Sequence, residues 1–102
     1  MGMIRGTTPT HIFTLPFDVS MVQKIRIIYA QNGTVKLTKT EADCTLEGNT
    51  VQVKLTQEDT LAFVAQSAAE IQVRVLTPAG DALASEPRWI GVNRLLENEV
   101  IE

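Results

Sequence analysis

The chain has 102 residues, of which 44% are hydrophobic and 21% are charged, a balance typical of one globular domain with a single core. Nine lysines and arginines against twelve aspartates and glutamates give a formal net charge of −3. Nonspecific nucleic-acid binding requires a basic excess, so no nucleic-acid partner is expected. The longest wholly apolar run, Leu61 to Ala65, is far shorter than the ~20 residues of a membrane span, and no signal-peptide layout is present. We therefore expect a soluble, unexported protein with no membrane partner.

The first nine residues show no periodicity. Met1-Gly2 stands before a second methionine, Met3, as residues added for expression often do, so Gly2 is assigned no role. Residues 4–9 contain a glycine, two threonines and a proline. This composition predicts a mobile N-terminal arm over residues 1–9.

From Thr10 onward, short runs rich in Val, Ile and Thr alternate with turn signals about every ten residues, which is typical of a β-sandwich or barrel. Asn32-Gly33 predicts a type I′ hairpin, and Gly48-Asn49 predicts a second hairpin. The predicted strands are Thr10–Leu15, Lys24–Gln31, Thr34–Lys39, Cys44–Glu47, Thr50–Leu55, Glu70–Thr77 and Ala82–Val92.

Alternation within three of these strands indicates which side chains face the core. The inward residues are predicted to be Val51, Val53, Leu55, Ile71, Val73 and Val75, and Ile25, Ile27 and Tyr29 are predicted to share one face of their strand. In the last strand the alternation changes phase near Pro87, which indicates a bulge or an edge position there. Thr56 followed three residues later by Asp59 resembles a helix N-cap, so a helical turn or two should cross between the sheets.

Together these elements predict an all-β fold: an immunoglobulin-like antiparallel β-sandwich of about seven strands with one short helical crossover, over residues 10–92. An incomplete barrel is the alternative, because a pattern of strands does not fix which sheet each strand joins. Residues 93–102 form a C-terminal tail in which glutamates alternate with apolar residues. Such a tail could dock, extend a sheet edge or join a partner.

No catalytic, cofactor or metal site is expected. The single histidine, His11, has no nucleophile and orienting acid signalled beside it, so a structural or solvated histidine is favoured. The single cysteine, Cys44, is expected to be a buried structural thiol in acidic surroundings. The carboxylates lack the spacing of a calcium loop or of a glycosidase pair, and no phosphate-binding glycine motif is present.

The best candidate for partner binding is the segment from Pro87 to Ile101. Arg and Trp are enriched at binding hot spots, and Arg88-Trp89 lies in the predicted edge strand. A lone Trp in a small sandwich is more often a core residue, so burial of Trp89 is favoured over a contact with a partner. The partner-binding candidates are Arg88, Trp89, Leu95, Leu96, Val100 and Ile101.

Much of the chain resembles small proteins encoded in phage and prophage structural modules of Gram-positive bacteria. The resemblance is carried by three segments: Thr8–Pro16, Tyr29–Gly33, and Cys44–Val51 continuing through Leu55–Asp59. Those proteins are similar in architecture to immunoglobulin-like modules of tail and baseplate proteins. The resemblance implies a noncatalytic structural or interaction protein of a phage or prophage particle. Its partners would be other structural proteins of the particle or a second copy of itself.

The same resemblance places the protein in the virion or in the cytoplasm of a lysogenic bacterial host. The shared segments are turns and caps, so no functional residue is carried over. A carbohydrate-binding module is the alternative function. Exposure of Trp89 and Tyr29 on one shallow face would favour sugar binding, whereas burial of both beside an apolar edge patch would favour assembly.

Overall fold

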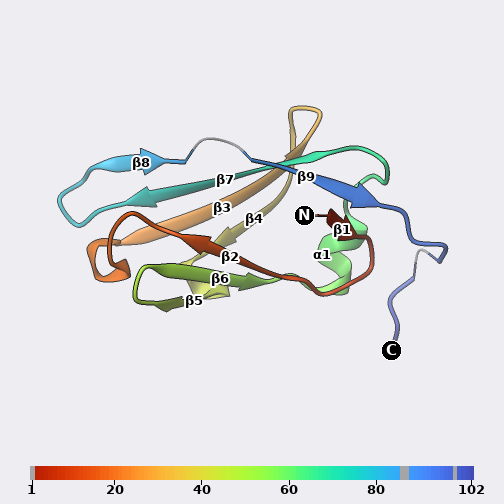
Figure 1. Cartoon of the computed structure of the whole chain (residues 1–102), viewed down its shortest axis with the longest axis horizontal. Helices are drawn as coiled ribbons and strands as arrows, with labels where there is room; N and C mark the ends of the chain where they lie inside the picture. The colour runs from red at the N-terminus through yellow and green to blue at the C-terminus, as the bar shows by residue number, and fades with distance from the viewer. Residues whose placement is uncertain (1, 86–87, 98) are drawn as a thin grey trace.

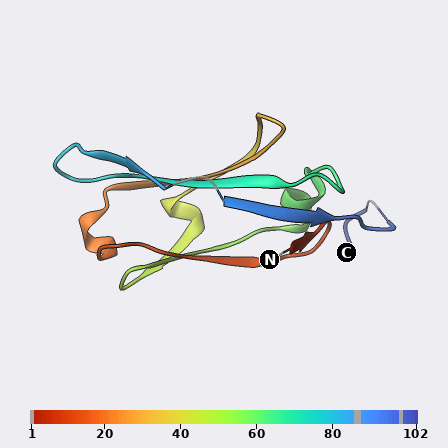
Figure 2. The same ribbon diagram turned by 45° about the horizontal axis from the view of Figure 1, so that its top comes forward.

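The computed structural model describes residues 2–85, 88–97 and 99–102, which form two β-sheets packed face to face (Figure 1; Figure 2). Its strands are β1 (Gly2–Ile4), β2 (Thr10–Thr14), β3 (Lys24–Gln31), β4 (Thr34–Thr40), β5 (Cys44–Glu47), β6 (Thr50–Lys54), β7 (Ala69–Leu76), β8 (Ala82–Ala84) and β9 (Arg88–Asn93). One sheet has the order β1-β9-β7-β3-β4, with β8 also paired to β7, and the other has the order β2-β6-β5. The pair β1–β9 is parallel, and the remaining pairs are antiparallel.

This strand order is that of an immunoglobulin-like sandwich. In such sandwiches, strands A, B, E and D form one sheet, and G, F and C, with C′ in variable-type domains, form the other. Here β2, β6 and β5 take the places of B, E and D, while β9, β7, β3 and β4 take those of G, F, C and C′. The predicted fold class is therefore confirmed. Because β1 lies beside β9, the sheet β2-β6-β5 has no strand in the position of A.

The core lies between the two sheets. All six residues predicted to face inward are buried, as are Ile25, Ile27 and Tyr29, which share one face of β3. The core also contains Met3, Leu15, Phe63, Ala69, Ile90 and Val92. Strand alternation was sufficient to identify these side chains because each sheet has one face on the core and one face in solvent.

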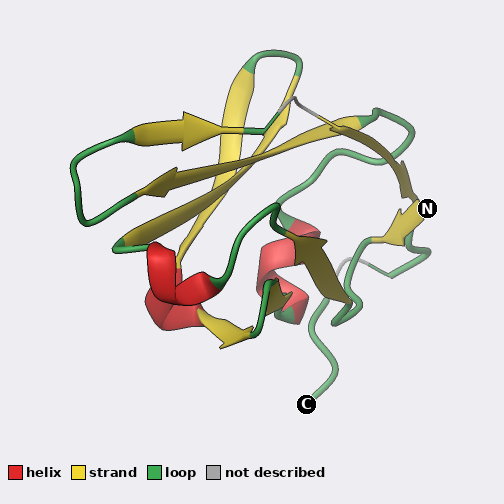
Figure 3. Ribbon diagram, turned by 60° about the vertical axis from the view of Figure 1, so that its left-hand side comes forward, coloured by secondary structure: helices red, strands yellow, loops and turns green. Residues whose placement is uncertain are grey.

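The predicted turns and helical crossover are present. Asn32 and Gly33 have φ angles of 51° and 78°, as a type I′ hairpin requires. Helix α1 (Gln57–Leu61) follows β6, and short 3-10 turns occupy Val19–Met21 and Glu41–Asp43 (Figure 3). Thr56 Oγ1 accepts a hydrogen bond from Asp59 N at 3.1 Å, and Asp59 Oδ2 accepts one from Thr56 N at 2.9 Å. This reciprocal capping starts α1 at the predicted place.

The N-terminal segment differs from the prediction of a mobile arm over residues 1–9. Gly2 and Met3 pair with Gly91 and Val92 of β9, and the Met3 side chain is 1% exposed. Arg5 N also donates to Asn93 O at 3.1 Å. Burial of an apolar side chain together with backbone pairing fixes this segment on the body of the protein.

The predicted last strand is divided into β8 and β9. Leu83 pairs with inward-facing Val75, whereas Ile90 and Val92 are the buried residues of β9, so the phase of the alternation changes between the two strands, as expected. The predicted bulge or edge position at Pro87 itself lies outside the described residues. The division of this strand, together with β1, gives nine described strands instead of about seven.

Candidate functional site

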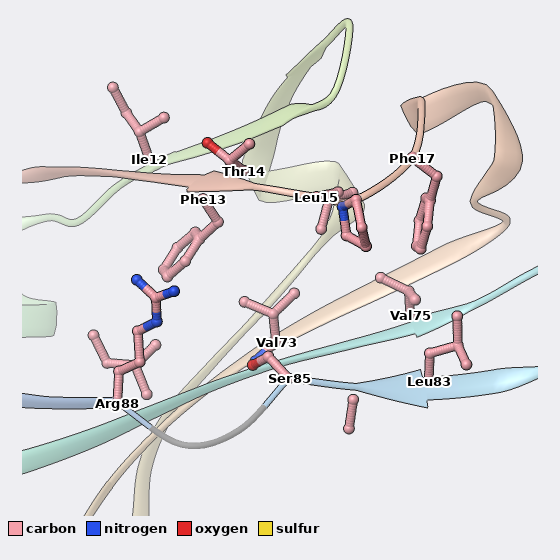
Figure 4. Close-up of a pocket in the computed structure, with 13 residues that line it drawn as sticks. Ile12, Phe13, Thr14, Leu15, Phe17, Val73, Val75, Leu83, Ser85 and Arg88 are labelled. Atoms are coloured by element: carbon pink, nitrogen blue, oxygen red, sulfur yellow. The ribbon is translucent and has the colours of Figure 1, made fainter.

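A groove of about 460 Å³ opens between the two sheets, along the edge of β2 (Figure 4). Phe13 and Leu15 line it from the side of β2, and Val73, Val75 and Leu83 line it from β7 and β8. Ile12 and Thr14 point away from it, as alternation on a strand requires. The groove is thus an opening into the space between the sheets.

The groove exists because a strand is missing beside β2. Leu15 N donates to Asn49 O at 2.7 Å, and Leu55 N donates to Pro9 O at 2.9 Å. Odd-numbered residues from 9 to 15 therefore direct their backbone groups toward β6, so the N–H and C=O groups of Thr10, Ile12 and Thr14 point to the open edge. No described strand pairs with that edge.

The opposite wall of the groove has a second free edge. Ser85 N donates to Val73 O at 2.9 Å, and Ser85 Oγ accepts from Val73 N at 3.0 Å. This pairing continues through β8, so the backbone groups of Ala82 and Ala84 point away from β7. The site has the requirements for strand addition: unpaired backbone groups beside pockets for alternate side chains.

Arg88 is the one charged side chain among the described residues that line the groove. It lies on the same side of β9 as buried Ile90 and Val92, and its guanidinium group points toward Phe13 (Figure 4). A segment that binds here must therefore be apolar on one face and compatible with a positive charge at the Phe13 end.

The structure brings only Arg88 of the sequence candidates into this groove. Trp89 is 62% exposed on the outer face of β9, where it pairs with Glu70 on β7, so the favoured burial of Trp89 is wrong. Ile90 and Val92 are the buried residues of β9. Trp89 lies next to Ile90 in the strand, so its side chain is on the opposite face.

The candidates of the C-terminal tail lie elsewhere in the fold. Leu95 is half-buried against Gly6, whereas Leu96 is 90% exposed. Ile101 is also exposed, and its backbone N and O form hydrogen bonds with the Gln57 side-chain amide at 2.7 and 3.1 Å. Val100 is half-buried. The tail therefore rests near α1, held by few described contacts.

The two buried titratable side chains among the described residues, His11 and Tyr29, form a hydrogen-bonded pair in the core. His11 Nδ1 lies 2.6 Å from Tyr29 Oη, and both side chains are buried. Burial lowers the pKa of His11 and raises the pKa of Tyr29 above its ordinary value, so both stay neutral at pH 7. Of the two alternatives for His11, the structural one holds.

Cys44 is half-buried, where the sequence predicted full burial. Its Sγ donates to Thr40 O at 3.2 Å, and the thiol is free. Burial and the nearby carboxylates of Asp43 and Glu41 raise the pKa of Cys44, which keeps the thiol protonated and weakly nucleophilic.

Two further features are absent from the part of the chain that the structure describes. No group of three or more His, Cys, Asp or Glu side chains is placed to hold a metal ion there. No described helix is both long and apolar enough to cross a membrane.

Sequence reasoning missed most of the groove. Nothing in the sequence indicated that Phe13, Phe17, Val73 and Leu83 line a groove. The groove depends on the outer edge of β2, with which no described strand pairs. The available signal was the phase change near Pro87, which turns Leu83 toward the groove mouth and Arg88 into it.

Comparisons with known proteins add little to this picture. No family model matches the chain, and no curated protein matches it. Among solved structures, the chain is similar to the V domain of amphioxus IgVJ-C2 at 13% sequence identity, with 91% of this chain and 99% of that chain covered and a TM-score of 0.37. A similarity of this size carries no argument about function.

Proposed function

We propose that the protein is a noncatalytic structural protein of a phage or prophage particle, of the tail or baseplate type, that binds neighbouring subunits by accepting an extended segment along β2. The observation that carries the interaction role is the groove with its unpaired β2 edge. Main-chain hydrogen bonds to Ile12 and Thr14 would give affinity, and the pockets around Phe13 and Leu83 would select side chains. The phage context rests on the sequence resemblance alone.

A carbohydrate-binding role has weaker support. Trp89 is exposed, but Tyr29 is fully buried, so the two aromatic residues do not form one platform. The polar end of Tyr29 is occupied by His11. Sugar binding was expected to need both Trp89 and Tyr29 exposed on one shallow face, and only Trp89 is exposed.

Site-specific photocross-linking in the assembled particle tests the proposal. A photoreactive amino acid at Leu83, which is 46% exposed at the groove, should link the protein to a neighbouring subunit of the particle, either another protein or a second copy of this chain. The same group at Leu46, which is 38% exposed on β5 at the other end of the small sheet, is the matched control and should not form that link.

Mass spectrometry of purified particles from an induced lysogen should detect the chain in a fixed ratio to other tail proteins. Absence of the chain from particles would refute the phage role. Equal cross-linking from Leu46 and Leu83 would refute the assignment of the interaction to the groove.

A further inference from the structure

We propose that the segment that enters the groove is residues 94–102 of a second copy of this chain, so that copies associate head to tail. The inference rests on the proposed function, because it requires that the groove accept a strand. It adds the identity of the donor. The donor is inferred from the chemistry of the groove and from the exposure of Leu96, which at 90% is the most exposed of the large hydrophobic residues that the structure describes.

The groove requires a donor that is apolar on one face and acidic near one end. Its walls are the side chains of Phe13, Val73, Val75 and Leu83, with the guanidinium group of Arg88 beside Phe13. An inward-pointing charge at a sheet edge ordinarily discourages pairing with apolar strands. A carboxylate on the donor would remove this penalty, so the cation selects acidic strands over purely apolar ones.

Residues 94–102 have this chemistry. Leu96 is 90% exposed and Ile101 is 78% exposed, and the segment contains three glutamates. No ion pair involves Glu97, Glu99 or Glu102 among the residues that the structure describes. The described contacts of the segment with its own body are the packing of half-buried Leu95 and Val100 and the Gln57–Ile101 hydrogen bonds, which are the contacts that a transfer to a neighbour would replace.

The two-residue period of a strand fixes which donor side chains enter the groove. On a strand, one face would carry Arg94, Leu96, Asn98, Val100 and Glu102, and the other would carry Leu95, Glu97, Glu99 and Ile101. If Glu102 meets Arg88 at the Phe13 end, Leu96 lies toward the Phe17 and Leu83 end. The donor then runs antiparallel to β2, and the face that carries Leu95, Glu97, Glu99 and Ile101 is turned to solvent.

The position of the segment makes the contact intermolecular. It leaves the body at the end that carries α1, whereas β8 lies at the opposite end (Figure 1). A tail that binds the groove of the next copy creates a heterologous interface, since donor and acceptor surfaces differ. Such contacts close into rings or extend into filaments, both of which suit a particle component.

Analytical ultracentrifugation of the full chain, from micromolar to millimolar concentration, tests this inference. The parent should form species larger than a monomer. Leu96→Ser should raise the dissociation constant by about tenfold or more, since it removes one apolar anchor. Its control, Ile101→Ser, changes a similarly exposed residue on the other face and should leave the dissociation constant unchanged. Both side chains are exposed, so neither change should disturb the monomer.

Charge exchange gives a second and independent readout. Arg88→Glu and Glu102→Arg should each weaken association by about tenfold or more, and the two together should restore it. Arg74→Glu makes the same charge change at an exposed residue that does not line the groove, and it should not be rescued by Glu102→Arg.

A parent chain that is monomeric at every concentration would overturn the inference, as would association that is insensitive to Leu96→Ser or lacks rescue by charge exchange. Neither result would refute the proposed function, which the Leu83 cross-link in particles decides separately. A cross-link from Leu83 to a different protein, with a monomeric parent, would mean that the donor strand belongs to that protein.

Discussion

At the scale of single residues, the centre of the sandwich is organised by His11 and Tyr29. His11 comes from β2 and Tyr29 from β3, so the hydrogen bond between them joins the two sheets. The rings of Tyr29 and Phe63 pack edge to face, with ring centroids 5.9 Å apart. In antibody domains this region holds an inter-sheet disulfide and a tryptophan. Here the two sheets are joined by a buried hydrogen-bonded pair, and Cys44 is a free thiol.

The buried histidine predicts a dependence of stability on pH. Burial lowers the pKa of folded His11, so between that value and about 6.5, the ordinary histidine pKa, the unfolded chain binds more protons than the folded chain. The free energy of unfolding should therefore be greatest above about pH 6.5 and should fall as the pH drops through that value toward the folded pKa. Urea denaturation at a series of pH values measures this slope.

His11→Gln is the control for that slope. The pKa values of Asp18, Glu41 and Asp59 are also lowered in the folded chain. These carboxyl groups change the free energy of unfolding only in more acidic solution, at and below the ordinary carboxyl pKa. The variant should therefore lose the dependence between about pH 6.5 and 5. An unchanged slope in His11→Gln would show that another group is responsible.

Gly33 predicts a second effect at the residue scale. Its φ of 78° lies in the left-handed region, and a Cβ built there would meet nothing within 4 Å. Gly33→Val should thus be penalised by backbone strain alone, by about 1–3 kcal/mol. Gly91→Val is the matched control, because Gly91 also has open space around it but no positive φ. Equal denaturation midpoints for the two variants would contradict the assigned turn.

At the scale of elements, alternation and turn chemistry predicted the strands that have one buried face. The two hairpins and the capped start of α1 depend on residues close in sequence, so local patterns were sufficient. β1 could not be found in this way, since three residues form it and their partner, β9, lies at the other end of the chain. Trp89 was misplaced because its burial was predicted from the general tendency of a lone tryptophan, whereas the alternation along β9 puts Ile90 and Val92 on the core face.

Core truncation in two strands distinguishes the packed interior from the groove. Val53→Ala removes a side chain that is 1% exposed and should cost about 1–3 kcal/mol. Val73→Ala should fall at the low end of that range, because Val73 borders the groove, where water can occupy the space left behind. Val35→Ala, at a residue that is 58% exposed, should change the free energy of unfolding by less than about 0.5 kcal/mol. Unchanged stability of both core variants would mean that the strand register is wrong.

At the scale of the whole molecule, the groove follows from the assignment of strands to sheets. The sequence showed which segments form strands, but it did not show that the first strand would leave β2 without a neighbour. That outcome depends on β1 pairing with β9 over a long sequence separation. The candidate site was therefore predictable only at Arg88, where a local phase change redirects one side chain.

The same architecture predicts that thermal stability depends on protein concentration. A donor segment that binds only the folded groove stabilises the native state by mass action, by about 2.7 kcal/mol when its concentration is a hundred times the dissociation constant. For a domain of this size, each kcal/mol raises the midpoint of unfolding by about 4–8 °C, so a shift of roughly 10 °C or more is expected across that range. Circular dichroism melts at increasing concentrations measure the shift. Leu96→Ser should show a clearly smaller shift than the parent, because its dissociation constant is raised while its fold is intact. A midpoint that rises equally in the parent and in Leu96→Ser would locate the contact outside the tail, and a flat midpoint in both would mean that the folded chain does not bind itself.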